Sequence, residues 1–265
     1  MKILIKVGGT LLDEPASRQS IASQLADVAR QHQTVVVHGG GKQVTRYLQD
    51  RGVESRFVGG LRVSDSAVID AVTNVIAGSV NKHFVASLIS AGAEAVGISG
   101  VDGLLTYAEQ LRPELGFVGR PVETSARLLD LLLAGQYLPV IACIGGDRQG
   151  TIFNVNADQM AVSCAAGWQA DRLIFLTDVP GVKDATGSVL SRLSVPDTQA
   201  LISSGVAHGG MQAKLEAAQT ALLAGIGEVT IALGQESNVC ARLLSDEALG
   251  TRLYLSLPEE SGAKT

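Results

Sequence analysis

The feature that most constrains this chain is a regular alternation of short apolar runs with helical patterns. Residues 3–7 form an apolar run that stops at two glycines, and Ile21, Leu25 and Val28 then repeat at helical spacing. Residues 34–38 form a second apolar run, which stops at three glycines. Strands that are apolar on both faces and alternate with helices are typical of parallel sheets with helices on both sides. The sequence therefore predicts an α/β fold, a three-layer αβα sandwich with a central, mainly parallel sheet.

The same alternation continues along the rest of the chain. We expect further strands at 95–98, 138–144, 173–177, 229–233 and 253–255, and helices at 69–80, 128–133, 160–166 and 211–222. The segment from about 106 to 123 breaks the rhythm, and residues 116–119 predict an antiparallel hairpin strand inserted on the sheet. We divide the chain into two lobes at residue 167, an N-terminal lobe of 1–167 and a C-terminal lobe of 168–265.

Composition and charge disfavour several classes of protein. The formal net charge of −5 and an aromatic content of 4% argue against nucleic acid or an anionic membrane as the main partner. Three cysteines, far apart and odd in number, predict no disulfide framework. No apolar run approaches the length of a membrane span, and the first residues do not form a signal peptide. We therefore expect a soluble cytoplasmic protein.

Glycine clusters after predicted strands are the main functional signal. They are Gly8 and Gly9, Gly39 to Gly41, and Gly145 and Gly146. Ligands of open α/β sheets bind at the carboxyl ends of the strands, and glycine lets backbone N–H groups approach an anion there. A following helix adds the positive end of its dipole. We therefore expect an anion site formed by these clusters.

Two standard phosphate motifs are absent. A P-loop would need glycine at position 36 and Ser or Thr at position 43, where Val36 and Gln43 stand. The dinucleotide fingerprint would need glycine at position 44, where Val44 stands. The predicted anion site must therefore be of another kind.

Two lysines and one short polar segment are the candidate reactive groups. Lys6 lies inside the first apolar run, where a buried ammonium needs an anionic partner. Lys214 lies near the start of a predicted helix, where the dipole disfavours a cation. Asn156 or Asp158 is expected to cap the helix that follows, and the two amides and one carboxylate within residues 154–158 also suit ligand recognition. Because the histidines have no metal spacing and no Ser-His-Asp set is visible, phosphoryl transfer fits this inventory best.

The motifs, taken in order, resemble those of the amino acid kinase family over almost the whole chain. They are Lys6-Val-Gly-Gly, His38-Gly-Gly-Gly-Lys, Gly60-Leu-Arg-Val, Asn154-Val-Asn-Ala-Asp-Gln, Leu176-Thr-Asp-Val-Pro-Gly-Val and Gly209-Gly-Met-Gln-Ala-Lys. The first and fifth are shared across the family. The third together with the fourth resembles more specifically those members that act on N-acetyl-L-glutamate.

The resemblance implies a reaction and its participants. The expected reaction is ATP-dependent phosphorylation of the side-chain carboxylate of N-acetyl-L-glutamate, giving N-acetyl-L-glutamyl 5-phosphate in arginine biosynthesis. The N-terminal lobe would bind acetylglutamate and the C-terminal lobe ATP. Magnesium would arrive with ATP, held mainly by the phosphates, so we assign no metal ligand to the protein.

Motif matching also implies a role for each site residue. Lys6 and Lys214 would neutralise the transferring phosphoryl group, and Asp158 would hold the two lysines in place. Arg62 would clamp the α-carboxylate of the substrate, for which a guanidinium fork is well shaped, and Asn154 would bind the same end. The remaining expected contacts are Gly40 and Gly41 with the substrate side, and Lys6, Gly8, Gly9, Asp178, Gly181 and Lys214 with the nucleotide.

Three other functions stay open at this point. One is a kinase of the same fold that acts on another carboxylate, such as an N-acetylaminoadipate derivative or aspartate. A second is a non-catalytic effector-binding module, which the presence of both Lys6 and Lys214 disfavours. A third is a nicotinamide-dependent oxidoreductase, which the absent dinucleotide fingerprint disfavours.

The resemblance further suggests an assembly state and a regulatory property. Relatives pair their N-terminal lobes, so we expect a homodimer that uses the helix around Ile69 to Val80. Arginine-inhibited members carry a helix before the first strand, whereas here only Met1 and Lys2 precede that strand. We therefore expect that arginine does not inhibit this protein.

Overall fold

An eight-stranded sheet forms the frame of the computed structural model, which describes residues 1–257. Its strands are β5 (Ala95–Ser99), β8 (Leu138–Ala142), β2 (Gln33–His38), β1 (Lys2–Val7), β11 (Arg172–Thr177), β13 (Glu228–Leu233), β14 (Thr251–Tyr254) and β12 (Arg192–Ser194), in that spatial order. Neighbouring strands are parallel except β13 and β14. The predicted mainly parallel sheet is confirmed.

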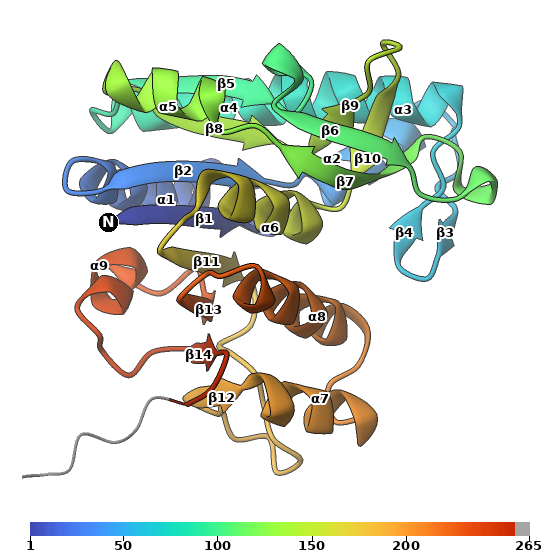
Figure 1. Ribbon diagram of the computed structural model, residues 1–265. Coiled ribbons are helices and arrows are strands. Elements are labelled where there is room, and N and C mark those ends of the chain that lie inside the picture. The colour runs from blue at the N-terminus through green and yellow to red at the C-terminus, as the bar shows by residue number, and fades with distance from the viewer. Residues whose placement is uncertain (258–265) are drawn as a thin grey trace, which may run out of the picture.

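Helices cover both faces of this sheet, which confirms the predicted three layers (Figure 1). On one face α1 (Pro15–Ala29) packs against α4 (Asn81–Ser90) and α9 (Val239–Leu244), and on the other α6 (Ala157–Trp168) packs against α8 (Gly209–Leu223). The remaining α-helices are α2 (Gly41–Gln49), α3 (Ser66–Val72), α5 (Arg127–Ala134) and α7 (Val195–Ser203). Shorter helical turns are η1 (Gly9–Leu12), η3 (Asp102–Leu104) and η4 (Pro113–Leu115).

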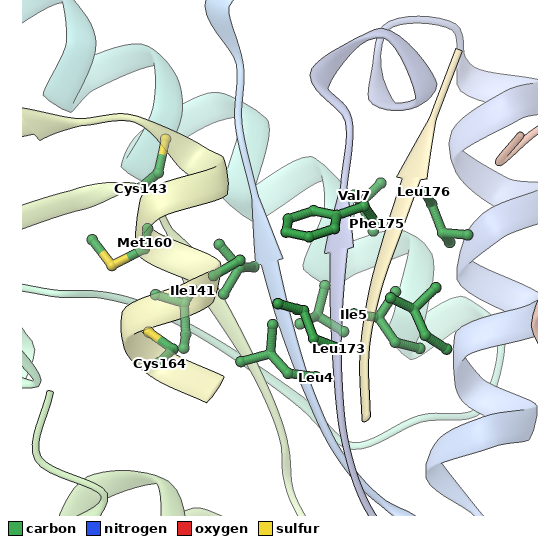
Figure 2. Packing of buried hydrophobic residues seen from close by; sticks show 14 of the residues in the cluster. Leu4, Ile5, Val7, Ile141, Cys143, Met160, Cys164, Leu173, Phe175 and Leu176 are labelled. Atoms are coloured by element: carbon green, nitrogen blue, oxygen red, sulfur yellow. The ribbon is translucent and has the colours of Figure 1, made fainter. Parts of the chain in front are cut away.

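The central strands are apolar because both of their faces are buried. Figure 2 shows Leu4 and Ile5 of β1 beside Leu173 and Phe175 of β11, with Met160 and other α6 side chains packed against the sheet. Each fully buried side chain of this size contributes about 1.5–3 kcal/mol relative to an exposed one. Lys6 is the one charged residue among the buried positions 3–7 of β1, so its burial needs a specific compensation.

A small ring of four strands lies beside the main sheet and corrects two predictions. Strands β6 (Thr106–Gln110) and β7 (Val118–Thr124) form the expected antiparallel hairpin, but they pair with β9 (Ile144–Gly146) and β10 (Ile152–Val155) and not with the main sheet. The expected strand 138–144 also divides, since β8 ends at Ala142 and β9 turns into the ring. Local apolar patterning did not predict this change of sheet.

The third glycine cluster belongs to that ring and not to the anion site. A Cβ added to Gly145 would lie 2.9 Å from the Cβ of Ala108 on β6. Gly145 and Gly146 are buried in β9 and allow the strands to approach closely. The predicted contribution of this cluster to an anion site was therefore wrong.

The expected long helix at 69–80 is part of a longer helical run of three segments. Helix α3 continues into the π-helix η2 (Thr73–Val80), which continues into α4. Its apolar residues Ile69, Val72, Ile76 and Val80 are all buried within the single chain. A short hairpin precedes the run and projects from the body of the molecule (Figure 1). Its two strands, β3 (Phe57–Val58) and β4 (Leu61–Arg62), have two residues each.

The division into lobes at residue 167 stays a prediction. Gly167 lies in the last turn of α6, and β1 of the first lobe pairs with β11 of the second. Residues 258–265 of the predicted C-terminal lobe lie outside the described residues. Across residues 1–257, no helix is both long enough and apolar enough to span a bilayer.

Candidate active site

The first two glycine clusters lie together at the carboxyl edge of the central strands. Gly8 and Gly9 follow β1, and Gly39 to Gly41 follow its parallel neighbour β2. A Cβ added to Gly9 would lie 3.1 Å from the backbone nitrogen of Gly40. The two turns are therefore in contact, and glycine at position 9 is what permits this approach.

The backbone amides of these turns divide into used and free donors. The N–H of Gly8 donates to the carbonyl of Leu176 at 2.9 Å. Within residues 1–257, the N–H groups of Gly9, Gly40 and Gly41 donate to no protein acceptor. Gly40 is also buried, and α2 begins at Gly41. Free amides at a helix start are what an anion site requires, so this edge can hold phosphate.

Lys6, Asp158 and Lys214 form a cluster of charges next to this edge, the first two buried and the third partly buried. The ammonium of Lys6 on β1 lies 2.8 Å from Oδ1 of Asp158, and that of Lys214 on α8 lies 3.1 Å from Oδ2. The side chains of Lys6 and Asp158 are 8% and 10% exposed, and that of Lys214 is 19% exposed. The three residues come from three elements far apart in sequence, and the structure brings them together as predicted from the motifs.

Asp158 is available to the lysines because its neighbour caps the helix. The side-chain oxygen of Asn156 accepts hydrogen bonds from the N–H groups of Asp158 and Gln159, so Asn156 is the N-cap of α6. Burial by itself would raise the pKa of Asp158, but the two ammonium groups outweigh it and hold that pKa below its ordinary value. Asp158 is therefore ionised at neutral pH.

Arg62 reaches the same glycine turn from the β3–β4 hairpin. Its guanidinium donates to the carbonyl of Gly41 at 2.9 Å, to Oγ1 of Thr45 at 2.7 Å and to Oγ of Ser55 at 2.5 Å. The group lies over the ring of Phe57, 4.7 Å from its centre. Burial lowers the pKa of Arg62, but a guanidinium stays charged at neutral pH. Arg62 is thus a fixed cation beside the turn.

A cavity of about 170 Å³ lies between Arg62 and the glycine turn. Asn154, Val72, Ile76 and Cys143 also line it, and the Nδ2 group of Asn154 donates to Oγ of Ser64 at 3.1 Å. Burial raises the pKa of the Cys143 thiol to about 12, so this residue (labelled in Figure 2) stays protonated. A larger hollow of about 540 Å³ lies at the opposite edge of the sheet, where His32, Glu94 and Tyr137 are among the lining residues.

The residues predicted to contact the nucleotide lie at the neighbouring strand end. Asp178 follows β11 directly and is exposed. Gly181 lies further along the same turn, where an added Cβ would be 2.7 Å from Oγ1 of Thr251. Because β11 is the parallel neighbour of β1, this turn lies at the same edge as Gly8 and Gly9. Within residues 1–257, no group of three or more His, Cys, Asp or Glu side chains is arranged to hold a metal ion.

Sequence reasoning missed several polar residues that support the site. Gln43 donates from Nε2 to the carbonyl of Gly9 at 2.9 Å and so joins the two glycine turns. His38 and Asn81 form a buried hydrogen bond behind the second turn. His38 ends an apolar strand, which was a usable signal. Gln43 and Asn81 lie in helical segments, where nothing local distinguishes them from surface residues.

The chain belongs to the amino acid kinase family, whose model matches residues 1–232. It is 56% identical to the acetylglutamate kinase of Solibacter usitatus strain Ellin6076 over 254 residues, which cover 96% of this chain and 99% of the relative. It is 43% identical to the acetylglutamate kinase of Acidobacterium capsulatum over 248 residues, covering 92% and 95%.

The fold of the chain is similar to that of a solved structure. The chain matches N-acetylglutamate synthase from Neisseria gonorrhoeae, which was crystallised with coenzyme A and N-acetyl-glutamate, with a TM-score of 0.86 at 22% identity. The match covers 97% of this chain but only 60% of that longer one. At this identity the likeness concerns the fold alone.

Replacing Asp158 by Asn is expected to make the free energy of unfolding less sensitive to acid. Folding lowers the pKa of Asp158, so its contribution to stability is complete above the unfolded value of about 3.9 and is lost as pH falls through the lower folded value. Urea unfolding between about pH 5 and pH 3 measures this, and the wild type should lose more stability than the variant. Asp130→Asn is the control, because Asp130 is exposed on α5. Its free energy of unfolding should fall with pH along the same slope as that of the wild type. Equal slopes for wild type and Asp158→Asn would contradict the ion pairs.

Proposed function

We propose that this chain transfers the γ-phosphoryl group of ATP to the side-chain carboxylate of N-acetyl-L-glutamate in arginine biosynthesis. Support comes from relatives named acetylglutamate kinase that match it over nearly its whole length. The observation on this chain that carries the proposal is the pairing of Lys6 and Lys214 with one carboxylate beside free glycine amides.

The chemistry suits a site that has no general base. A carboxylate is ionised at neutral pH, so its oxygen attacks the γ-phosphorus without losing a proton. The bond from that phosphorus to the β,γ-bridging oxygen breaks, and ADP leaves with the electron pair. The main barrier is the negative charge on both reactants and on the transferring group, which cations and amides offset. The site provides these groups.

Each lysine keeps donors for the phosphates while it is paired with Asp158. An ammonium carries three N–H donors. Lys214 donates one to Oδ2 of Asp158, and Lys6 is ion-paired with Oδ1, so each lysine keeps at least two donors. Asp158 fixes the positions of Lys6 and Lys214 and is itself ionised, so it acts as a positioning group. The free N–H groups of Gly9, Gly40 and Gly41 lie beside the lysines and would donate to the same phosphoryl group, and we call these amides and the two lysines the phosphoryl cradle.

We assign the cavity beside Arg62 to acetylglutamate. Arg62 would bind the α-carboxylate with the N–H groups it does not already use, since a guanidinium has five donors. Asn154 lines the same cavity and would bind the same end of the substrate. Val72 and Ile76 provide apolar wall for the remainder of the molecule.

We assign the nucleotide to the edge formed by the turns after β1 and β11. Gly8, Gly9, Asp178 and Gly181 lie there, with Lys6 and Lys214 at its inner end. Magnesium enters as part of the MgATP substrate, held mainly by the phosphates. We also propose a homodimer, which rests on the family resemblance, and a cytoplasmic location, which rests on the sequence features described above.

The first test is a coupled assay of ADP release with a panel of acceptors. The proposal predicts turnover with N-acetyl-L-glutamate that greatly exceeds turnover with glutamate, aspartate or N-acetylaminoadipate. A preference for another carboxylate would assign a different substrate to the same reaction. Nucleotide binding without turnover on any acceptor would favour an effector-binding module.

Lys6→Met and Lys214→Met should each lower kcat about 100-fold or more while the KM values change far less. The lysine charges matter most where phosphoryl charge is redistributed in the transition state. Lys2→Met is the matched control, because Lys2 lies at the other end of β1, where its Nζ donates to the carbonyl of Trp168. Steady-state kinetics measures all three variants, and a kcat near wild type for Lys6→Met or Lys214→Met contradicts the mechanism.

Arg62→Lys should raise the KM for acetylglutamate by about tenfold or more and leave the KM for ATP nearly unchanged. Lysine keeps the charge but loses the planar fork, and a charge-assisted hydrogen bond contributes about 1.5–3 kcal/mol. Arg46→Lys on α2 is the control, since Arg46 is exposed and pairs with Asp13. A selective rise in the KM for ATP would place Arg62 in the nucleotide subsite.

A further inference from the structure

We infer that His38 and Asn81 are positioning residues, a buried hydrogen-bonded pair that orients the turn Gly39–Gly41 toward the phosphoryl group. The inference rests on the proposed kinase function for its kinetic test. His38 is the last residue of β2 and Asn81 the first of α4, and both are fully buried. Neither touches the cavity, so any effect on the reaction passes through the turn.

The hydrogen bonds fix the chemical form of His38. Its Nδ1 lies 2.9 Å from the carbonyl oxygen of Gly39, and its Nε2 lies 3.0 Å from Nδ2 of Asn81. A carbonyl only accepts, so Nδ1 carries the hydrogen, and Nε2 accepts from the amide of Asn81. Burial lowers the pKa of His38 to about 4, which keeps the ring neutral at physiological pH.

Asn81 is itself fixed by strands on the far side. Its Nδ2 also donates to the carbonyl of Val140 on β8 at 3.0 Å, and its Oδ1 accepts from Lys82 at 3.1 Å. Lys82 in turn donates to the carbonyl of Gly97 on β5 at 2.9 Å. Each polar atom of the His38 and Asn81 side chains therefore has a partner, as a buried network requires.

Gly97 shows that the chain makes room for this network. A Cβ added to Gly97 would lie only 2.0 Å from Oδ1 of Asn81. Any larger residue at position 97 would displace the amide of Asn81, although position 97 lies two strands away from His38 in the sheet order.

The geometry of the peptide bond explains what the pair does to the site. In a planar trans peptide the C=O and the following N–H point in opposite directions. Because His38 holds the carbonyl of Gly39, the N–H of Gly40 points away from His38, and it has no protein acceptor within residues 1–257.

The π-helix η2 leaves little room for anything larger than glycine at position 40 of the same turn. A Cβ added to Gly40 would lie 3.2 Å from Cγ1 of Ile76 and 3.5 Å from Cγ2 of Val80, both in η2. Asn81 follows η2 directly. The element that limits the room at position 40 therefore also places the partner of His38, so the turn and Asn81 lie against one helical run.

The kinetic test compares His38→Leu with His38→Asn. Leucine removes both hydrogen bonds, and kcat should fall about 10- to 100-fold with the KM values within about threefold. Asparagine places a donor near the position of Nδ1 and should recover a large part of kcat, although leucine is the better buried residue and should give the higher melting temperature. If His38 served only the stability of the fold, kcat would follow the melting temperature and would be higher in His38→Leu than in His38→Asn. Equal kcat for the two variants, or wild-type kcat in His38→Leu, overturns the inference.

Gly97→Ala provides a remote version of the same test. It should lower kcat like His38→Leu, and the double variant should be no worse than His38→Leu alone, because both act through one network. Thr198→Val is the control, since Thr198 is a buried residue hydrogen-bonded to Gln219 in the α7–α8 region and should affect stability without affecting kcat. Additive losses in the double variant contradict coupling through Asn81.

A spectroscopic measurement separates this inference from the proposed function. The ¹⁵N resonances of the His38 ring at neutral pH should report a protonated Nδ1 and an unprotonated Nε2 in the wild type, and Gly97→Ala should alter them. A ring protonated at Nε2 overturns the inference whatever acceptor the enzyme uses. If the expected tautomer is found but no carboxylate is phosphorylated, the proposed function fails while the positioning of the turn stands.

Discussion

The candidate site depends on one carboxylate that holds two ammonium groups, that of Lys6 buried and that of Lys214 partly buried. Lys6 and Lys214 contribute two positive charges and Asp158 one negative charge, so the cluster keeps a net charge of +1. Burying an uncompensated charge is costly, and the cost falls when an anion arrives. Asp158 offsets enough positive charge to allow Lys6 inside a central strand. The positive charge that remains favours the binding of a phosphate. Stability and ligand affinity have a common origin here.

The fold makes this cluster possible by bringing three distant segments to one edge. Strand β1 carries Lys6, the first turn of α6 carries Asp158, and α8 carries Lys214. Helix α6 packs against both the sheet and α8, so its amino-terminal end lies between the two lysines. Asn156 contributes to the cluster as well, because it caps α6 and so leaves Asp158 free to bind both cations. A helix that used Asp158 as its cap would lose the carboxylate from the site.

Much of this arrangement could be predicted from the sequence, and the failures have a common cause. The strands, the glycine turns and Lys6 carry local signals, since each departs from the surrounding pattern. Gly145 and Gly146 carry the same local signal as the glycines that we propose to bind phosphate, yet they serve strand packing. Only the pairing of β9 with the other strands of the ring distinguishes them. The pair His38 and Asn81 spans 43 positions, and its need for Gly97 is visible only when β5, β8 and α4 are placed together. Long-range geometry, and not residue chemistry, was the missing information.

The turn Gly39–Gly41 links the two halves of the proposed reaction. Its first carbonyl accepts from His38 and its last from Arg62, so polar groups hold the turn at both ends. Gly40 lies between them, where Ile76 and Val80 of η2 would be 3.2 Å and 3.5 Å from an added Cβ and so leave little room for a larger residue. Arg62 is also the proposed contact for the α-carboxylate of the substrate. If Arg62 moves when the substrate binds, its hydrogen bond to the Gly41 carbonyl changes as well. Substrate recognition and the phosphoryl cradle thus share one backbone segment. That segment is restrained by hydrogen bonds to its carbonyls, which leaves its amides as the groups free to meet charge.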